Sequence, residues 1–179
     1  MTFAFVKTAA GLPTLAMAFG VALGMAAPVA AQAEAEACPA NEGPAIQANV
    51  AGLKDRTGIV KLELYPDNPT DFLKDDHDLI AQGKVFRRVE MKPPATGELV
   101  MCMKVPKPGR YALLFTHNRD GKNKFSFWSD GAGFPSNHRL GRQRPSVDEA
   151  LVEVGKGVTV TNIRVQYLRG LAGFGPLTN

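Results

Sequence analysis

The residues best suited to chemistry lie in one polar stretch, from His117 to Asn137. His117 and Asp120 could serve as a general base and its orienting carboxylate, with Ser126 or Ser136 as the nucleophile. Triads are recognised by geometry, and closeness in sequence does not establish that geometry. The chain also lacks a Gly-x-Ser-x-Gly elbow. We therefore keep a metal-dependent or hydrolytic enzyme using His117 and Asp120 as the alternative, and interpret His117 as a structural residue that bonds a loop carbonyl.

Basic and aromatic side chains are interleaved around the same stretch. Between Lys104 and Arg144 the chain has nine basic and two acidic residues, together with its single tryptophan, Trp128. A positive surface with aromatic side chains favours an anionic partner. A second interpretation is that the aromatic side chains close the open end of the fold and the basic ones form its solvated rim. For an exported chain we expect no nucleic acid as partner, but an anionic glycan, a lipid headgroup or another protein.

The elements that position these residues are β-strands, because the hydrophobic pattern after residue 45 repeats every two residues. Turn signals rich in Gly, Pro and Asp separate the apolar runs. The expected strands cover residues 46–50, 60–65, 85–91, 99–105, 111–116, 151–154 and 158–168, and a short helix is expected within 69–81. The predicted fold class is all-β: a single immunoglobulin-like or transthyretin-like β-sandwich of about seven strands.

The same alternation predicts which side chains face the core. The inward-facing set is Val60, Leu62, Leu64, Leu99, Met101, Met103, Ala112, Leu114, Ile163 and Val165. On the opposite faces of these strands, the side chains expected to face water are Lys61, Glu63, Arg164 and Gln166. Because a one-residue slip in strand pairing would bury these polar groups, the register is well specified.

Residues 1–33 predict a cleaved signal peptide and hence a periplasmic or secreted protein. Lys7 provides a short positive region, residues 12–25 an apolar one, and residues 31–33 (AQA) a small-x-small cleavage site. The alternatives are an uncleaved membrane anchor and a lipoprotein modified at Cys38. After the signal peptide we expect no transmembrane segment. The expected parts of the mature chain are a flexible leader over 34–45, a β-sandwich domain over 46–169 and a C-terminal tail over 170–179.

Export gives the two cysteines, Cys38 and Cys102, a structural meaning. In an oxidising compartment, two thiols in a small domain are more often paired than free. We predict a disulfide that fixes the leader to the sheet. The alternatives are a free, buried Cys102 and intermolecular pairing through Cys38.

Three segments of the chain resemble one bacterial family. They are PKPGRYALLFTHN over residues 106–118, GFPSN over 133–137 and PSVDEA over 145–150. Together they resemble the domain-of-unknown-function 2141 family, which implies an exported all-β domain without an established activity. Two departures from the family pattern are Asn118, where aspartate is frequent, and a shorter segment over 131–137.

The resemblance also draws attention to a loop similar to calcium loops, because family members often carry Asp-x-Asn-x-Asn-Gly-x-x-Asp there. The corresponding residues of this chain are Asn118, Asp120, Lys122, Asn123 and Ser126. Lys122 places a cation where a ligand oxygen is needed, and only one carboxylate remains. We therefore predict no metal ligands and no cofactor, and interpret the loop as tight turns whose side chains bond their own backbone.

These observations favour an exported, non-catalytic module of the cell envelope with a binding or structural role. Its expected recognition surface comprises His117, Asp120, Trp128, Arg139, Arg142 and Arg144.

Overall fold

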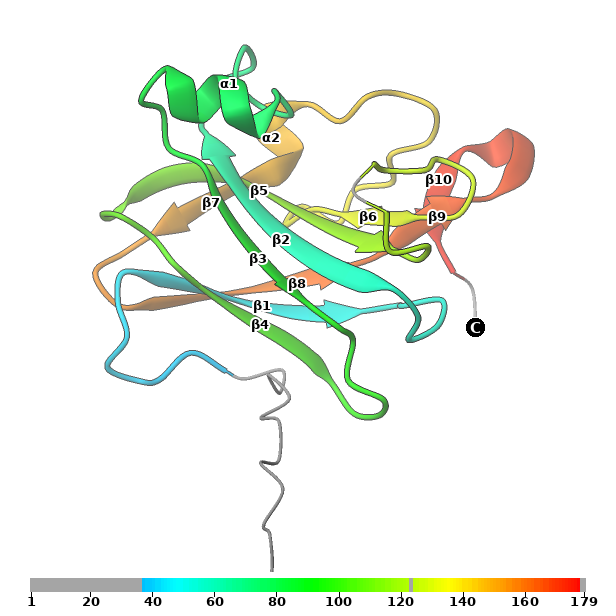
Figure 1. Cartoon of the computed structure of the whole chain (residues 1–179), viewed down its shortest axis with the longest axis horizontal. Helices are drawn as coiled ribbons and strands as arrows, with labels where there is room; N and C mark the ends of the chain where they lie inside the picture. Colours follow the sequence, from blue (N-terminus) through cyan, green and yellow to red (C-terminus); the bar gives the residue numbers. More distant parts are fainter. Residues whose placement is uncertain (1–36, 123, 178–179) are drawn as a thin grey trace, which may run out of the picture. The chain divides into compact units, whose positions relative to one another are not determined.

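The computed structural model describes residues 37–122 and 124–177 (Figure 1). The predicted signal peptide lies outside the described residues. In chain order the elements are β1 (Ala45–Ala51), β2 (Ile59–Pro66), α1 (Asp76–Ala81), β3 (Arg87–Met91), β4 (Leu99–Lys104), β5 (Gly109–Asn118), β6 (Gly131–Gly133), α2 (Val147–Ala150), β7 (Leu151–Val154), β8 (Val158–Arg164), β9 (Gln166–Leu168), the 3-10 helix η1 (Gly170–Ala172) and β10 (Phe174–Pro176).

The strands form two sheets, which confirms the predicted all-β sandwich. The small sheet has the order β4-β1-β8, with β1 antiparallel to β4 and parallel to β8. The large sheet has the order β10-β9-β6-β5-β2-β3, and β7 pairs with the first residues of β5. The described residues contain ten strands and not the expected seven. Two of the extra strands, β6 and β10, have only three residues each, and the third arises because the run over 158–168 forms both β8 and β9.

The core has two parts because both faces of β5 are buried. Tyr111, Leu113 and Phe115 join the main cluster between the sheets. Ala112 and Leu114 join a second cluster on the outer face of the large sheet, where α1 and α2 cover it (Figure 1). All ten predicted core residues are buried. However, the two β5 residues among them face this second cluster, and the prediction that they share a face with the β2 residues is wrong.

The covered outer face also corrects the prediction that Lys61 and Glu63 face water. Both are only 7% exposed. Glu63 accepts hydrogen bonds from the Tyr65 hydroxyl (3.0 Å) and from Arg88 Nε (2.6 Å). Lys61 Nζ lies 3.0 Å from a carboxylate oxygen of Glu90. Because each charge has an ionic partner, the buried charges are compensated.

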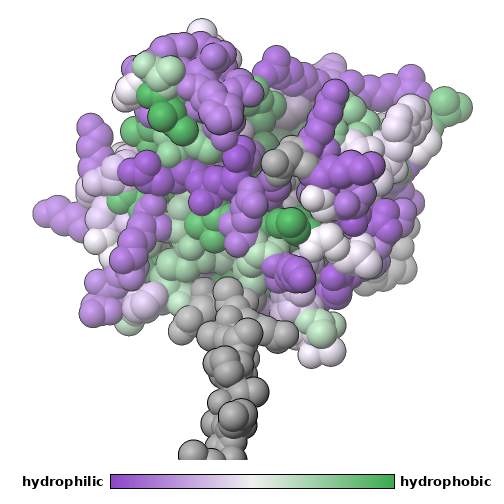
Figure 2. All heavy atoms as spheres, in the orientation of Figure 1, coloured by the Kyte–Doolittle hydropathy of each residue, from purple (hydrophilic) through white to green (hydrophobic). Residues whose placement is uncertain are grey.

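β3 is an edge strand of the large sheet and β4 is an edge strand of the small sheet. Part of the hydrophobic core is visible between these two edges. Apolar atoms show between these two strands, whereas most of the surrounding surface is hydrophilic (Figure 2). Half-buried Val85, Val89 and Met91 pack against the core cluster there.

The run predicted as one strand over 158–168 changes sheets at Val165. Its first part, β8, pairs with β1, and its second part, β9, pairs with β6 and β10. The change of sheet buries Gln166, which was expected to face water. The Gln166 amide donates to the carbonyl of His138 (2.6 Å) and accepts from the backbone N–H of Leu140 (3.0 Å).

Residues at both ends of the domain, which were expected to form a flexible leader and a tail, are tied to the sheets. Cys38 and Cys102 form the predicted disulfide, with their Cα atoms 5.0 Å apart. Cys38 lies in the expected leader, so the bond fixes that segment to β4. The expected tail from residue 170 instead contains η1 and β10, and Phe174 of β10 is buried.

Candidate functional site

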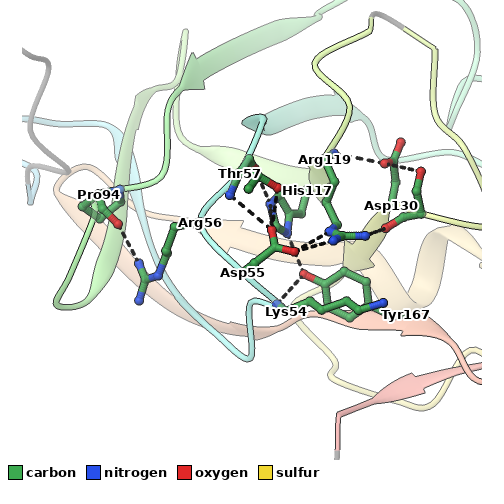
Figure 3. A network of polar contacts seen from close by, with 10 residues as sticks. Lys54, Asp55, Arg56, Thr57, Pro94, His117, Arg119, Asp130 and Tyr167 are labelled. Atoms are coloured by element: carbon green, nitrogen blue, oxygen red, sulfur yellow. Dashed lines mark hydrogen bonds and ion pairs between the residues drawn. The ribbon is translucent and has the colours of Figure 1, made fainter.

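His117 lies at the end of β5, completely buried, and both of its ring nitrogens have hydrogen-bond partners (Figure 3). Nε2 lies 2.8 Å from the carbonyl oxygen of Thr57, and Nδ1 lies 2.6 Å from Tyr167 Oη. A carbonyl oxygen only accepts, so Nε2 carries the proton. In the neutral ring Nδ1 then accepts the Tyr167 hydroxyl proton, and Tyr167 Oη accepts from the backbone N–H of Lys54 (3.0 Å).

The burial of these rings keeps both of them uncharged. Burial lowers the pKa of His117 below its usual value, although the Thr57 carbonyl and the Asp55 carboxylate act in the opposite direction. Burial raises the pKa of Tyr167 to about 12. At neutral pH His117 is therefore a neutral ring and Tyr167 a protonated donor, which is the state that the hydrogen bonds require.

An ion pair lies next to this histidine. Asp55 accepts from Arg119 through Nε (2.8 Å) and through a second guanidinium nitrogen. The other Asp55 oxygen accepts from the Thr57 hydroxyl (2.7 Å) and lies 3.9 Å from His117 Nε2. The hydrogen bonds from Arg119 hold the pKa of Asp55 well below its usual range, against the opposing effect of burial. Asp55 is thus a charged, fixed acceptor that holds the β1–β2 loop against the end of β5.

Asp130 extends the network into the loop after β5 (Figure 3). Its carboxylate is buried and accepts from three donors: the backbone N–H of Arg119 (3.0 Å), the backbone N–H of Ser126 (2.8 Å) and the Ser129 hydroxyl (2.9 Å). The N–H of Asp130 donates to the Ser126 carbonyl (2.9 Å) and closes a turn over 126–130. Trp128 lies in that turn with 87% of its surface exposed. The network therefore fixes the turn that presents Trp128.

Three loops meet around Phe174, and we call residues 119–122, 124–130, 138–144 and 169–174 the loop end. The Phe174 ring lies 6.3 Å from the rings of both Phe125 and Phe127. Its backbone forms a bridge with Gly141. Two arginines hold η1 in place: Arg139 donates to the Ala172 carbonyl (3.1 Å) and Arg142 to the Leu171 carbonyl.

The structure brings together only part of the predicted recognition surface. Asp120, Trp128, Arg139, Arg142 and Arg144 fall within the residue ranges of the loop end. His117 lies in the interior beneath it and is not accessible to a partner. Arg144 reaches towards the second core cluster, where it lies 3.5 Å from the carbonyls of Phe72 and Leu73.

The loop resembling a calcium site bonds its own backbone. Asp120 accepts from the N–H of Lys122 (3.0 Å), and the Asn118 amide donates to the Lys122 carbonyl. Asn118 Oδ1 is buried and has no hydrogen-bond partner. Asn123 lies outside the described residues. In the described part of the chain, no group of three or more His, Cys, Asp and Glu side chains is placed to hold a metal ion.

Sequence reasoning did not find Asp55, Asp130 or Tyr167. Asp55 and Tyr167 are distant in sequence from His117, so no local pattern connects them. The only signal for Asp130 is an acidic residue in a basic stretch, four residues after Ser126. Leu171 and Phe174 fall in the segment that was expected to be a tail.

A surface hollow of about 570 Å³ lies elsewhere, beside β1 and β8. Asn49, Asn137 and Asn162 line it, and their amides are engaged in structural hydrogen bonds. Asn49 Nδ2 donates to Asn162 Oδ1 (3.1 Å), while Asn137 bonds the backbone of residues 162 and 164. The ionisable residues that line the hollow are Glu98 and Arg164.

The fold and the site define an all-β sandwich domain in which a buried polar network supports an aromatic and basic loop surface. Residues 48–162 match the family described as "Uncharacterized protein conserved in bacteria (DUF2141)". The match spans more than half of the chain, so the chain belongs to this family, as the sequence resemblance predicts. Comparison with curated proteins and with solved structures gives no match. Among the described residues, no helix is long and apolar enough to span a membrane.

Proposed function

We propose that this protein is an exported, non-catalytic binding module of the cell envelope. The disulfide between Cys38 and Cys102 supports export, because such bonds persist in oxidising compartments and are rare in the cytosol. The predicted signal peptide over residues 1–33 supports the same conclusion.

The observation that carries a binding role is the exposed Trp128 on a fixed turn. A large aromatic side chain that is 87% exposed gains little from the fold. Nevertheless, six hydrogen bonds of Asp130 and its neighbours order the turn that carries it. Ordering a contact residue in advance lowers the entropic cost of binding. The loop end contains seven basic and two acidic residues. Arg119 pairs with Asp55 outside it, and the remaining excess of positive charge favours an anionic envelope component as the partner.

The geometry does not favour the alternative of an enzyme that uses His117 and Asp120. A general base needs a free nitrogen within reach of the substrate proton. Both nitrogens of His117 are bonded inside the protein, and the ring has no exposed surface. Asp120 bonds its own turn at Lys122 and has no hydrogen bond to His117.

Binding of a soluble polyanion tests the proposed function, with heparin as the probe. We expect heparin to retain the processed protein at low salt and to release it as salt rises. The double variant Arg139→Gln/Arg142→Gln should elute at clearly lower salt than the wild type. The matched control Lys92→Gln/Lys156→Gln removes the same charge from exposed positions outside the loop end and should elute close to the wild type. Equal elution of the two double variants would contradict the assignment of the surface.

A further inference from the structure

We propose that the loop end is a membrane-docking surface, which inserts Phe127, Trp128 and Leu171 into the headgroup region of an anionic bilayer. This inference rests on the proposed function and specifies its partner. Five large apolar side chains are exposed in the described part of the chain, and three of them belong to the loop end. The other two, Ile80 on α1 and Val160 on β8, lie on separate elements.

The three side chains come from two turns that are joined to each other. Phe127 contacts Phe174, with ring centroids 6.3 Å apart, and Phe174 follows η1, which carries Leu171. Arg142 bonds the Leu171 carbonyl and thereby fixes that second turn. The apolar tips are therefore held in the same region of the surface by the fold itself.

The degree of exposure favours a bilayer over a glycan or a protein groove. Trp128 is 87% exposed and Leu171 is 88% exposed, so these side chains project from the surface and do not line a cleft. A sugar could stack on Trp128, but it offers no hydrocarbon to Leu171. Tryptophan suits the membrane interface because its ring is apolar and its N–H is polar, while leucine suits the hydrocarbon beneath.

The charges of the loop end match an anionic membrane surface. Its acidic groups are Asp120, which pairs with Lys122, and the buried Asp130, whose carboxylate is surrounded by protein donors. The remaining charge is positive. Basic residues near an anionic leaflet contribute attraction that salt weakens, and apolar insertion adds attraction that salt does not weaken.

Trp128 provides a direct measurement because it is the only tryptophan of the chain. The exported, processed protein is mixed with vesicles of phosphatidylglycerol and phosphatidylcholine in equal parts, or of phosphatidylcholine alone. With the anionic vesicles we expect a blue shift of the tryptophan emission and co-sedimentation of the protein. With phosphatidylcholine alone we expect partitioning that is at least about tenfold weaker, because the electrostatic attraction is lost.

Two pairs of variants separate insertion from non-specific adsorption. Leu171→Ser and Phe127→Ser should each lower the partition coefficient on anionic vesicles by about tenfold or more, because each removes a large apolar group from the interface. Ile80→Ser and Val160→Ser remove exposed apolar groups elsewhere and should change it less than about twofold. Melting temperatures close to that of the wild type verify that all four variants are folded.

Absence of both the blue shift and co-sedimentation at low salt would overturn the membrane assignment. Equal losses in Leu171→Ser and Val160→Ser would overturn it as well. If the protein then still binds heparin through Arg139 and Arg142, the proposed binding function stands and its partner is a polyanion other than a bilayer. If it binds neither probe, both proposals fail.

Discussion

Tyr167→Phe is the most direct test of the network beneath the loop end. The substitution keeps the buried ring and removes one oxygen. That oxygen donates to His117 Nδ1 and accepts from the backbone N–H of Lys54. Lys54 is exposed, so water can replace the lost partner of its N–H, whereas Nδ1 lies in a ring without exposed surface and remains unsatisfied.

The expected loss of stability follows from that one unsatisfied acceptor. A buried polar group without a partner costs about 1–3 kcal/mol, so we expect Tyr167→Phe to lower the free energy of unfolding by about 2 kcal/mol. For a domain of this size, that loss lowers the melting temperature by about 4–8 °C. Urea denaturation at pH 7, followed by circular dichroism, measures the change.

Tyr111→Phe is the matched control. The Tyr111 ring is equally buried, but its hydroxyl donates to the carbonyl of Lys107, an exposed residue, at 2.8 Å. Water can replace that donor, so we expect a loss below about 1 kcal/mol. Equal losses in the two variants would refute the reasoning. A nitrogen NMR spectrum that places the proton of neutral His117 on Nδ1 would also refute it.

Three further perturbations test other parts of the structure. The pKa of His117 is lowered in the folded state, so the unfolded chain binds more protons below about pH 6.5. The contribution of His117 to the free energy of unfolding is therefore complete above that pH and decreases as the pH falls towards the folded pKa. His117→Gln should flatten this dependence in urea titrations between about pH 7 and 5. Asp130→Asn should cost about 2–3 kcal/mol and increase the mobility of the single tryptophan, measured by fluorescence anisotropy, whereas the exposed-loop change Asp120→Asn should do neither. Replacing Cys38 and Cys102 by Ala should lower the free energy of unfolding by about 2–5 kcal/mol; a double variant that melts like the oxidised wild type would show that the bond does not stabilise the fold.

The alternation of residues was sufficient to predict the sandwich and most strands, but not which faces are covered. A period of two assigns Lys61 and Glu63 to one face of β2, and solvent is the default environment of such a face. Here α1, α2 and the segments beside them cover it. That covering depends on tertiary packing, which the pattern along β2 does not contain.

Glycine residues explain why β6 was not predicted as a strand. Gly131 and Gly133 indicate a turn by composition, yet they form β6. A Cβ at Gly131 would lie 2.6 Å from the Tyr167 ring, and one at Gly133 would lie 2.5 Å from Ile163. Glycine is used there for close approach between strands, which a single sequence does not distinguish from a turn.

The exposed side chains of the candidate site were predictable from the sequence, but the buried polar network beneath them was not. The aromatic and basic composition indicated Trp128, Arg139 and Arg142, and the interpretation of His117 as a structural histidine bonding a loop carbonyl agrees with its contact to Thr57. Its other partner, Tyr167, lies 50 residues away in sequence. Only the path of the chain from one sheet to the other brings Tyr167 to His117.

The parallel pairing of β1 with β8 has a consequence for the order of folding. Asn49 and Asn162 are register partners 113 residues apart, so the small sheet cannot close until nearly the whole domain has been synthesised. Pairing over such a separation is slow, because the entropy of closing the loop is lost before any contact compensates for it. The small sheet is therefore expected to form last, whereas β2 pairs with β3 and β5, strands much closer to it in sequence, so the large sheet can begin to assemble first.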